Sequence, residues 1–569
     1  MASNLTAHVK EPEAHDQSVQ AHPDQVPNKA GGFGFKVTPI EQLERFIILG
    51  TDGGSYYASE KQMTVENFKH IQSMLPEQGR LVVDTIVKIS DEARAPKNSS
   101  AVFALAVAAV VGDQDVRSYA YESMSKVCRT STDMFVFVDA VDQLKGHRWG
   151  MGLNRAIARW YTSKQARNVV FQICKYPQRK EQAMAQKWGH RDLLRKVKIG
   201  TGRAVKHPRG KAFVTPSDEH GVAFHYATHG KDGFSEEKWE TFQGNEHLQY
   251  LHAHEEAKAA TDGNVIADLI KRYGIVRESI PKELFTKKVW QALIDNGMPM
   301  TAMIRNLGAM TSAGVLGPFT PEAKKVAETL VNPEFLQKAR IHPMNLLIAL
   351  KAYQSGHGKS TNKEGEYRVN WSPVEKIVEA LDDGFHAAFK HVEPTGKNFL
   401  LGIDVSGSMG WGNIVGCGDL KSSEAAAVMA MTIARTEKNY HAFGFTTEFR
   451  DLGITRKDSL TTVLRRTSGM SFGGTDCALP MKYAYEKQLD VDVFVVLTDN
   501  ETWHGGIHPF EALRNYRKRF NKDAKLVVMA FTATDVTISE GHSDPGSLEV
   551  VGLDSAAPKL VSDFAAGRI

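Results

Sequence analysis

The stretch that most constrains the fold of this chain is residues 399–410, FLLGIDVSGSMG, in which a continuous apolar run ends at an acidic residue. A short apolar run of this kind is typical of a strand buried on both faces of a parallel sheet. In open α/β sheets, ligands bind beyond the carboxyl ends of such strands. Asp404, Ser406 and Ser408 lie at that point, and hard cations such as Mg²⁺ prefer their carboxylate and hydroxyl oxygens. The sequence therefore predicts a buried strand followed by a cation-binding loop.

Two later segments also contain loops with oxygen-bearing side chains. Residues 471–476, SFGGTD, form a glycine-rich stretch that contains Thr475. Residues 491–501, VDVFVVLTDNE, form a second apolar run, which ends at Asp499. Asp and Ser are also the commonest turn and capping residues, so the first loop alone would be weak support for a metal.

The order of the three loops resembles the metal-ion-dependent adhesion site of von Willebrand A domains. The resemblance implies a divalent cation, with Mg²⁺ as the expected ion. By that resemblance the direct ligands are Ser406, Ser408 and Thr475, while Asp404 and Asp499 act directly or through water.

The spacing of apolar residues divides the chain into two folded parts. Over residues 31–372 apolar residues recur at every third and fourth position, which predicts stacked amphipathic helices of the HEAT or armadillo type. Over residues 373–569 helical segments alternate with apolar strands, which predicts a doubly wound parallel sheet. Residues 1–30 are polar and rich in Pro, His and Gln, so we expect a disordered tail there.

Composition argues against a membrane or secreted protein. The longest apolar run, residues 101–111, is shorter than the roughly 20 residues that span a bilayer, so it predicts a buried helix. The start of the chain lacks the apolar core of a signal peptide, and its four cysteines are not clustered. We therefore expect a cytoplasmic protein with reduced thiols and no membrane partner.

The net charge of +4 conceals a strong segregation of charge. Residues 141–215 contain 18 Lys and Arg against 3 Asp and Glu, a net charge of +15, which leaves −11 for the rest of the chain. Cations can pair with phosphates, and aromatic rings can stack on bases, so this segment predicts nucleic-acid binding. A solvated basic surface without a partner is the alternative. The interleaved aromatic residues are Trp149, Trp160, Tyr161, Tyr176 and Trp188.

Phrases along the whole chain resemble one family. Residues 43–57, LERFIILGTDGGSYY, resemble the opening signature of the TROVE module of Ro ribonucleoprotein autoantigens. Phrases in the same order follow as KYPQR (175–179), WGHRDLLR (188–195), MPMTA (298–302), ARIHP (339–343), GGTDC (473–477) and TDNET (498–502). The resemblance implies an α-helical HEAT-like repeat ring followed by an α/β doubly wound von Willebrand A domain that closes it.

The resemblance also implies a non-catalytic RNA-binding protein of ribonucleoprotein particles. Small noncoding Y-like RNAs would bind an outer basic face, and single-stranded 3′ ends of misfolded or decaying noncoding RNAs would enter a central hole, for RNA quality control. Lys175 and Arg179 lie four residues apart and would share one helix face. A 3′-to-5′ exoribonuclease, or another protein that supplies a carboxylate, is a candidate partner at the ion site. The RNA-binding candidates are Arg155, Lys175, Arg179, His190, Arg191, Arg195 and Lys198.

Some features depart from the family pattern. Residues 180–187 look like an insertion, and Lys198 stands where metazoan members usually have a histidine, so the sequence supports general RNA binding better than recognition of Y RNA. Residues 207–254 contain seven histidines but no cysteine pair, so we expect an exposed insertion rather than a zinc site.

Two other functions remain open at this point. One is a protein-interaction scaffold that uses the ion site to bind a carboxylate of its partner. The other is a nuclease that uses the bound ion, although the chain has neither a nucleophile elbow nor a P-loop pattern.

Overall fold

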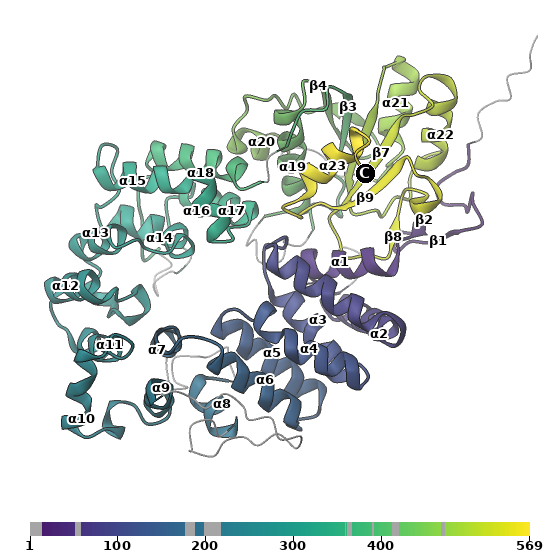
Figure 1. Cartoon of the computed structure of the whole chain (residues 1–569). Helices are drawn as coiled ribbons and strands as arrows, with labels where there is room; N and C mark the ends of the chain where they lie inside the picture. Colours follow the sequence, from purple (N-terminus) through teal and green to yellow (C-terminus); the bar gives the residue numbers. More distant parts are fainter. Residues whose placement is uncertain are drawn as a thin grey trace, which may run out of the picture. The chain divides into compact units, whose positions relative to one another are not determined.

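The structure is a computed structural model, and it describes residues 14–51, 59–176, 188–197, 218–358, 360, 367–389, 392–411, 420–467 and 473–569. The chain forms two compact units, which we describe separately (Figure 1). The helical unit comprises Phe68–Ala93 and Lys97–Ala388, and the sheet unit comprises Met1–Asn67, Arg94–Pro96 and Phe389–Ile569. No helix in the described ranges is long and apolar enough to cross a membrane.

The helical unit is a row of short helices, each of which packs mainly on near neighbours in the chain, as in a solenoid (Figure 1). The row begins with α3 (Ser99–Val111), which packs on α4 (Gln114–Val127) and α5 (Ser131–Leu144). It continues through α6 (Met151–Thr162), α7 (Ala166–Lys175), α8 (His190–Val197), α9 (Asp218–His229), α10 (Glu236–Glu240), α11 (Gln249–Ala259), α12 (Gly263–Tyr273), α13 (Lys287–Asp295), α14 (Met300–Ser312), α15 (Pro321–Leu330), α16 (Pro333–Lys338), α17 (Pro343–Gln354) and α18 (Glu375–Ala387). Short 3₁₀ helices lie at η2 (Lys231–Gly233), η3 (Thr241–Gly244), η4 (Arg277–Ser279) and η5 (Lys282–Leu284).

Local sequence explains where many of these helices begin. Thr130 and Asp133 form a capping box at the start of α5, and Thr320 followed by Pro321 starts α15. The apolar run at 101–111 forms most of α3, a helix buried over nearly its whole length, as predicted. The element α2 (Glu60–Asp91) consists of two helical stretches that meet at a kink, with non-helical geometry at Gln78 shortly after Pro76.

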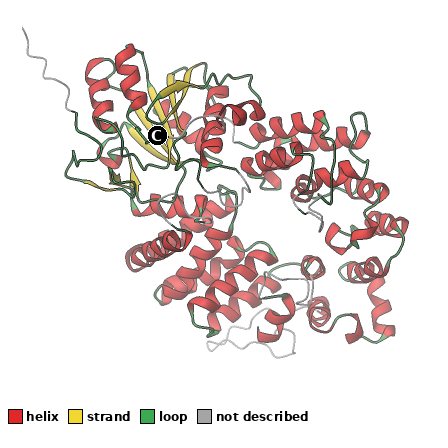
Figure 2. Cartoon of the chain, turned by 180° about the vertical axis from the view of Figure 1, so that it is seen from behind, coloured by secondary structure: helices red, strands yellow, loops and turns green. Residues whose placement is uncertain are grey.

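The sheet unit is built on a six-stranded sheet with strand order β5-β4-β3-β6-β7-β9. β3 (Asn398–Asp404), β4 (Asn439–Phe445), β6 (Val493–Thr498), β7 (Lys525–Ala530) and β9 (Ser547–Val551) are parallel. The edge strand β5 (Phe449–Asp451) is antiparallel, so the sheet is mixed rather than wholly parallel. Figure 2 shows these strands gathered together, with helices around them.

Helices cover both faces of this sheet. On one face, α21 (Leu479–Lys487) and α22 (Pro509–Arg519) share a buried core with the strands, in which Met481 and Tyr516 meet Phe494. On the other face, α19 (Ser422–Thr436) packs on β3, β4 and β6, and α23 (Ala557–Ala565) packs on β9 and α19. The remaining elements are α1 (Pro39–Leu49), α20 (Leu460–Thr467) and η6 (Gly541–Ser543).

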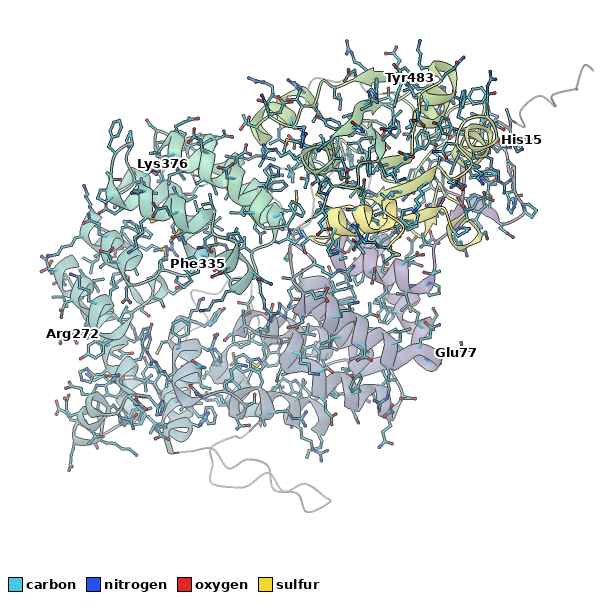
Figure 3. All side chains as sticks on the ribbon, turned by 45° about the horizontal axis from the view of Figure 1, so that its top comes forward. His15, Glu77, Arg272, Phe335, Lys376 and Tyr483 are labelled. Atoms are coloured by element: carbon cyan, nitrogen blue, oxygen red, sulfur yellow. The ribbon has the colours of Figure 1, made fainter. Side chains whose placement is uncertain are left out.

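The prediction of a disordered tail over residues 1–30 is wrong for residues 14–30; residues 1–13 lie outside the described residues. β1 (Gln25–Pro27) pairs with β2 (Phe33–Lys36), which pairs with β8 (Val536–Thr537) in a small antiparallel sheet. The Gln17 amide is buried and donates to the Asp476 carboxylate over 2.7 Å, and the amide N–H of His15, the residue labelled in Figure 3, donates to Glu511. The polar side chains that suggested disorder thus pair with buried polar groups.

The boundaries between the two parts also differ from those predicted at residues 30, 372 and 373. Helix α18 belongs to the helical unit, because its buried face, with Ile377, Leu381 and Phe385, packs on α15 and α17. Helix α1 belongs to the sheet unit, where the buried Arg45 guanidinium pairs with Glu549 over 2.8 Å. Amphipathic spacing identifies a helix but not the layer against which its apolar face packs.

Candidate functional site

The carboxyl ends of β3 and β6 bring the two predicted acidic ligands together. These strands are parallel neighbours, with Ile403 opposite Leu497. Asp404 therefore ends β3 beside Thr498, whose hydroxyl donates to the Asp404 carboxylate over 2.6 Å, and Asp499 follows at once. The strand order reverses between β3 and β6, which is where α/β sheets bind their ligands.

The three predicted hydroxyl ligands lie in loops that meet at this point. The Ser406 and Ser408 hydroxyl oxygens are 3.1 Å apart. The loop of Thr475 is tied to the loop after β6, because the Trp503 amide and the Thr502 hydroxyl both donate to the Thr475 carbonyl over 3.2 Å. The Thr475 hydroxyl has no hydrogen-bond partner among the described residues, so it is free to bind a ligand. The companion residue Ser471 lies outside them.

The electrostatics of this site favour a cation. Burial, and then the charge of Asp499, raise the pKa of Asp404 to about 7. Burial also raises the pKa of Asp499, although hydrogen bonding from Ser408 opposes the shift. Neither carboxylate has an ion pair with a Lys, Arg or His of the described residues. Two buried acids without a counter-ion, together with the hydroxyls of Ser406 and Ser408, fit the oxygen ligands that a hard divalent cation prefers.

The N-terminal segment supports the loop after β6, and sequence reasoning missed this role. The amides of Lys29 and Ala30 donate to the Glu501 carboxylate over 2.8 and 3.1 Å. The Asn28 amide donates to the Thr502 carbonyl over 2.6 Å. Asn500, between them, has a positive φ of 66°, an uncommon conformation that clusters at binding sites. No local pattern in residues 14–30 could have indicated partners more than 470 positions away.

Two exposed tryptophans lie on the loops that carry these ligands. Trp411 follows the Ser406–Ser408 loop and is 59% exposed, and Trp503 follows the loop after β6 and is 40% exposed. The Trp503 ring lies against Gly474, where a Cβ would come within 3.0 Å of it. Large exposed aromatic side chains are a feature of protein-binding surfaces.

Four predicted RNA contacts lie in the described part of the basic segment and are accessible or partly accessible. Arg191 and Arg195 are exposed on α8, four residues apart, and Arg155 is half-buried on α6. None of these three arginines forms an ion pair with another described residue. Lys175, half-buried at the end of α7, lies 3.9 Å from Glu278. Lys175 and Arg191 both line a cavity of about 1110 Å³.

The predicted RNA contact His190 lies in the core rather than on the surface. Its ring is buried, its Nδ1 lies 2.6 Å from the Tyr161 hydroxyl, and burial lowers its pKa to about 3. Trp160 and Tyr161 are also fully buried, so they cannot stack on bases. These aromatic residues contact one another in the core beneath α6 and α8, because burial removes their apolar rings from water.

The other two predicted RNA contacts, Arg179 and Lys198, lie outside the described residues. The predicted shared helix face of Lys175 and Arg179 therefore extends beyond the described residues; in the described part, α7 ends at Lys175 and Tyr176 is extended. Sequence reasoning also missed Lys196, whose ammonium lies 4.4 Å from the ring centre of Trp149 and 5.1 Å from that of Trp188.

The histidine-rich segment is not an exposed insertion. Its described part forms α9, α10 and α11 of the helical row; His207 lies outside it. His220 and His254 are buried, and His254 Nδ1 lies 2.8 Å from the Ser279 hydroxyl. Over the described ranges, no three His, Cys, Asp or Glu side chains are grouped to hold a metal ion, so the candidate ion site depends on its hydroxyls.

Known proteins resemble this chain over nearly its whole length. Family sequence models match at residues 26–370, as a TROVE domain, and at residues 398–565, as a Ro60 vWA domain. The chain is 33% identical to the RNA-binding protein RO60 of Caenorhabditis elegans, over 96% of this chain and 90% of that protein. It is also 33% identical to the RNA-binding protein RO60 of Deinococcus radiodurans, over 96% of each. The crystal structure of the Deinococcus radiodurans RO (RSR) protein superposes with a TM-score of 0.66 at 31% identity, covering 94% of this chain and 100% of that one.

Proposed function

Because this chain belongs to the Ro60 family, in which a TROVE domain precedes a vWA domain, we propose that it is an RNA-binding protein of ribonucleoprotein particles. Its relatives are named RNA-binding proteins and not enzymes. The observation that carries the proposal is the pair of exposed arginines on α8, Arg191 and Arg195, which have no carboxylate partner among the described residues. Unpaired cations one helical turn apart suit the phosphates of an RNA backbone.

We propose two classes of RNA ligand, each with its own surface. Small noncoding Y-like RNAs bind the basic face of α6 and α8, and single-stranded 3′ ends of misfolded noncoding RNAs pass through a central hole, for RNA quality control in the cytoplasm. A double helix is too wide to thread through a hole lined by helices, whereas a single strand is not, so the two classes need different surfaces.

Binding of labelled RNA to the full chain tests this proposal. We expect a stem-loop RNA and a single-stranded 3′ tail to bind with different salt slopes, and each to compete poorly with the other. Mutual displacement at equal concentrations would contradict two separate surfaces. Shortened RNA products after incubation with Mg²⁺ would instead support the nuclease function.

For the ion site we propose Mg²⁺, held by Ser406, Ser408, Thr475, Asp404 and Asp499. When bound, the ion supplies positive charge that can attract a carboxylate of a partner. The residues of this chain supply the rest: buried carboxylates neutralise the ion, and the loop after β6 holds the Thr475 loop in place through its carbonyl.

A protein-interaction scaffold is the second candidate function, and the exposed Trp411 and Trp503 favour it. The proposed partner is a protein with an accessible acidic residue, such as a 3′-to-5′ exoribonuclease. Binding of a candidate exoribonuclease that requires Mg²⁺ and is lost in Trp503→Ala would support a scaffold. Binding that is unchanged by EDTA and by this substitution would contradict it.

A further inference from the structure

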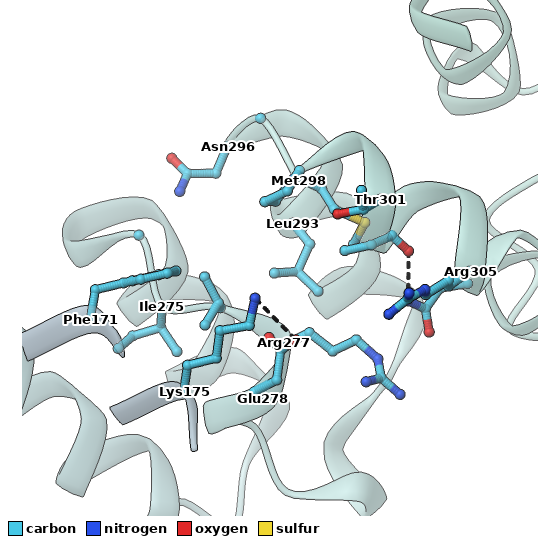
Figure 4. A pocket seen from close by; sticks show the side chains of 16 residues that line it. Phe171, Lys175, Ile275, Arg277, Glu278, Leu293, Asn296, Met298, Thr301 and Arg305 are labelled. Atoms are coloured by element: carbon cyan, nitrogen blue, oxygen red, sulfur yellow. Dashed lines mark hydrogen bonds and ion pairs between the residues drawn. The ribbon is translucent and has the colours of Figure 1, made fainter. Parts of the chain in front are cut away.

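The helical unit contains a second, smaller pocket of about 450 Å³ (Figure 4). It lies between the end of α7, the turn that follows α12 and the first turn of α14. Its volume is in the range of sites that bind small molecules. Two glycines with positive φ, Gly274 and Gly297, end α12 and α13 and turn the chain around the pocket.

The charged residues that line this pocket favour an anion. Lys175, Arg277 and Arg305 face it with a single acid, Glu278, so the lining has a net charge of +2. Glu278 pairs with Lys175, while Arg277 and Arg305 have no carboxylate partner among the described residues. The first turn of α14 also lines the pocket, and the amides at a helix N-terminus attract negative charge.

The rest of the lining suits a flat, partly polar group. Leu293 and Met298 are buried and form an apolar floor, and Phe171 is half-buried beside it (Figure 4). Phe171 and Lys175 share one face of α7, since they are four residues apart. The exposed Asn296 amide has no hydrogen-bond partner among the described residues, so it can donate to and accept from a ligand.

We propose that this pocket binds one nucleotide of a single-stranded RNA segment. The base lies on the floor beside Phe171 with its edge at Asn296, and the phosphate lies among Lys175, Arg277 and Arg305. An aromatic ring for stacking, an amide for the base edge and cations for the backbone are the three elements by which proteins bind unstacked RNA bases. This inference rests on the proposed RNA-binding function and assigns it a defined subsite.

In this subsite the Glu278 carboxylate competes with the RNA phosphate for the Lys175 ammonium. Its carboxylate holds Lys175 at 3.9 Å and must release it before that ammonium can pair with a phosphate. Because both side chains are about a third exposed, the ion pair is weak, and its loss should tighten RNA binding by only about two- to fivefold.

The test uses the full chain and a stem-loop RNA with a single-stranded 3′ tail, so that the stem sets the register of the tail. One tail position at a time is made abasic, which removes the base but keeps the phosphate. For the parent protein we expect one position at which the abasic change weakens binding about tenfold. Phe171→Leu and Asn296→Ala should reduce this penalty to within about twofold, because they remove the groups that contact the base.

Charge variants distinguish the contribution of the phosphate to binding from that of the base. Arg305→Gln should weaken the binding of all of the RNAs by a similar factor and leave the abasic penalty in place. Arg272→Gln, at an exposed α12 residue that does not line the pocket, is the matched control and should change neither (Figure 3). Glu278→Gln should tighten binding; weaker binding would contradict the competitor role.

The outcomes distinguish this inference from the proposed function. If the parent binds no RNA, the proposed function itself fails. If the parent binds RNA but shows no position-specific penalty, or if Phe171→Leu and Asn296→Ala keep the full penalty, only the subsite is overturned. Displacement of the RNA by micromolar AMP, without any abasic penalty, would assign the pocket to a free nucleotide and would also overturn the proposal.

Discussion

Replacement of Arg191 and Arg195 by Gln should weaken the binding of structured RNA strongly without affecting the fold. Both side chains are exposed on one face of α8 and have no carboxylate partner among the described residues, so neither supports a buried contact. Surface substitutions of this kind change the free energy of unfolding by about 0.5 kcal/mol or less. Any larger loss of RNA affinity would therefore reflect lost contacts with the RNA.

The magnitude follows from counterion release. Each lost phosphate contact reduces the slope of log affinity against log salt by about 0.7 to 0.9, so the double variant should lose about 1.4 to 1.8. Relative to 1 M salt, this corresponds at about 0.15 M to roughly a 15- to 30-fold loss of affinity, or about 1.6 to 2 kcal/mol. At 1 M salt the parent and the variant should bind almost equally.

Filter binding over a salt series measures both quantities. Lys518→Gln with Lys522→Gln is a matched control, because it removes the same charge from exposed residues of the sheet unit. We expect the control to bind like the parent. An unchanged slope with reduced affinity, or an equal loss in the control, would refute the assignment of α8 to the RNA-binding face.

Three further predictions concern other parts of the molecule. Ser406→Ala with Thr475→Ala should abolish Mg²⁺ binding in calorimetry and leave the circular dichroism spectrum unchanged; retained binding would place the ion elsewhere. Because burial lowers the pKa of His190 to about 3 from 6.5, the unfolded chain binds a proton below about pH 6.5 that the folded chain does not, and stability falls by about 2 kcal/mol by about pH 5. His190→Phe should remove that part of the pH dependence in urea titrations; identical pH profiles would contradict it. Gln17→Ala should cost about 1 to 3 kcal/mol of stability in urea titrations, because it leaves the buried Asp476 carboxylate with fewer donors; a loss below about 0.5 kcal/mol would show that this contact is dispensable.

The candidate ion site shows how far a sequence can predict the position of acidic residues. Asp404 and Asp499 each end an apolar run, and parallel strands share one edge for their carboxyl ends, so their proximity could be predicted without coordinates. The hydrogen bonds that Asn28, Lys29 and Ala30 donate to the loop after β6 could not be predicted from the sequence. Hydrogen bonds between residues more than 470 positions apart leave no local pattern.

The basic segment shows what could not be predicted from the sequence. Its charge and its aromatic residues were evident in the sequence, but the same spacing suits a stacking surface and a buried core. The structure places Trp160, Tyr161 and His190 in the core and leaves Arg191 and Arg195 exposed. The pocket around Phe171 and Arg305 could not be predicted from the sequence either, since it is formed by helices more than a hundred residues apart.

The sequence by itself determined the local elements of this protein: the amphipathic helices, the buried strands with acidic ends, and the family to which the chain belongs. The helices and strands depend on spacing within a few residues, which sets the secondary structure directly, whereas the family follows from phrases in a fixed order along the chain. Only the tertiary structure decided which faces are buried, that α18 joins the helical unit, and that residues 14–30 pack on the sheet unit. The physical reason is that burial and hydrogen bonding depend on neighbours in space, and a polar or aromatic side chain is stable in either environment when its partners are present.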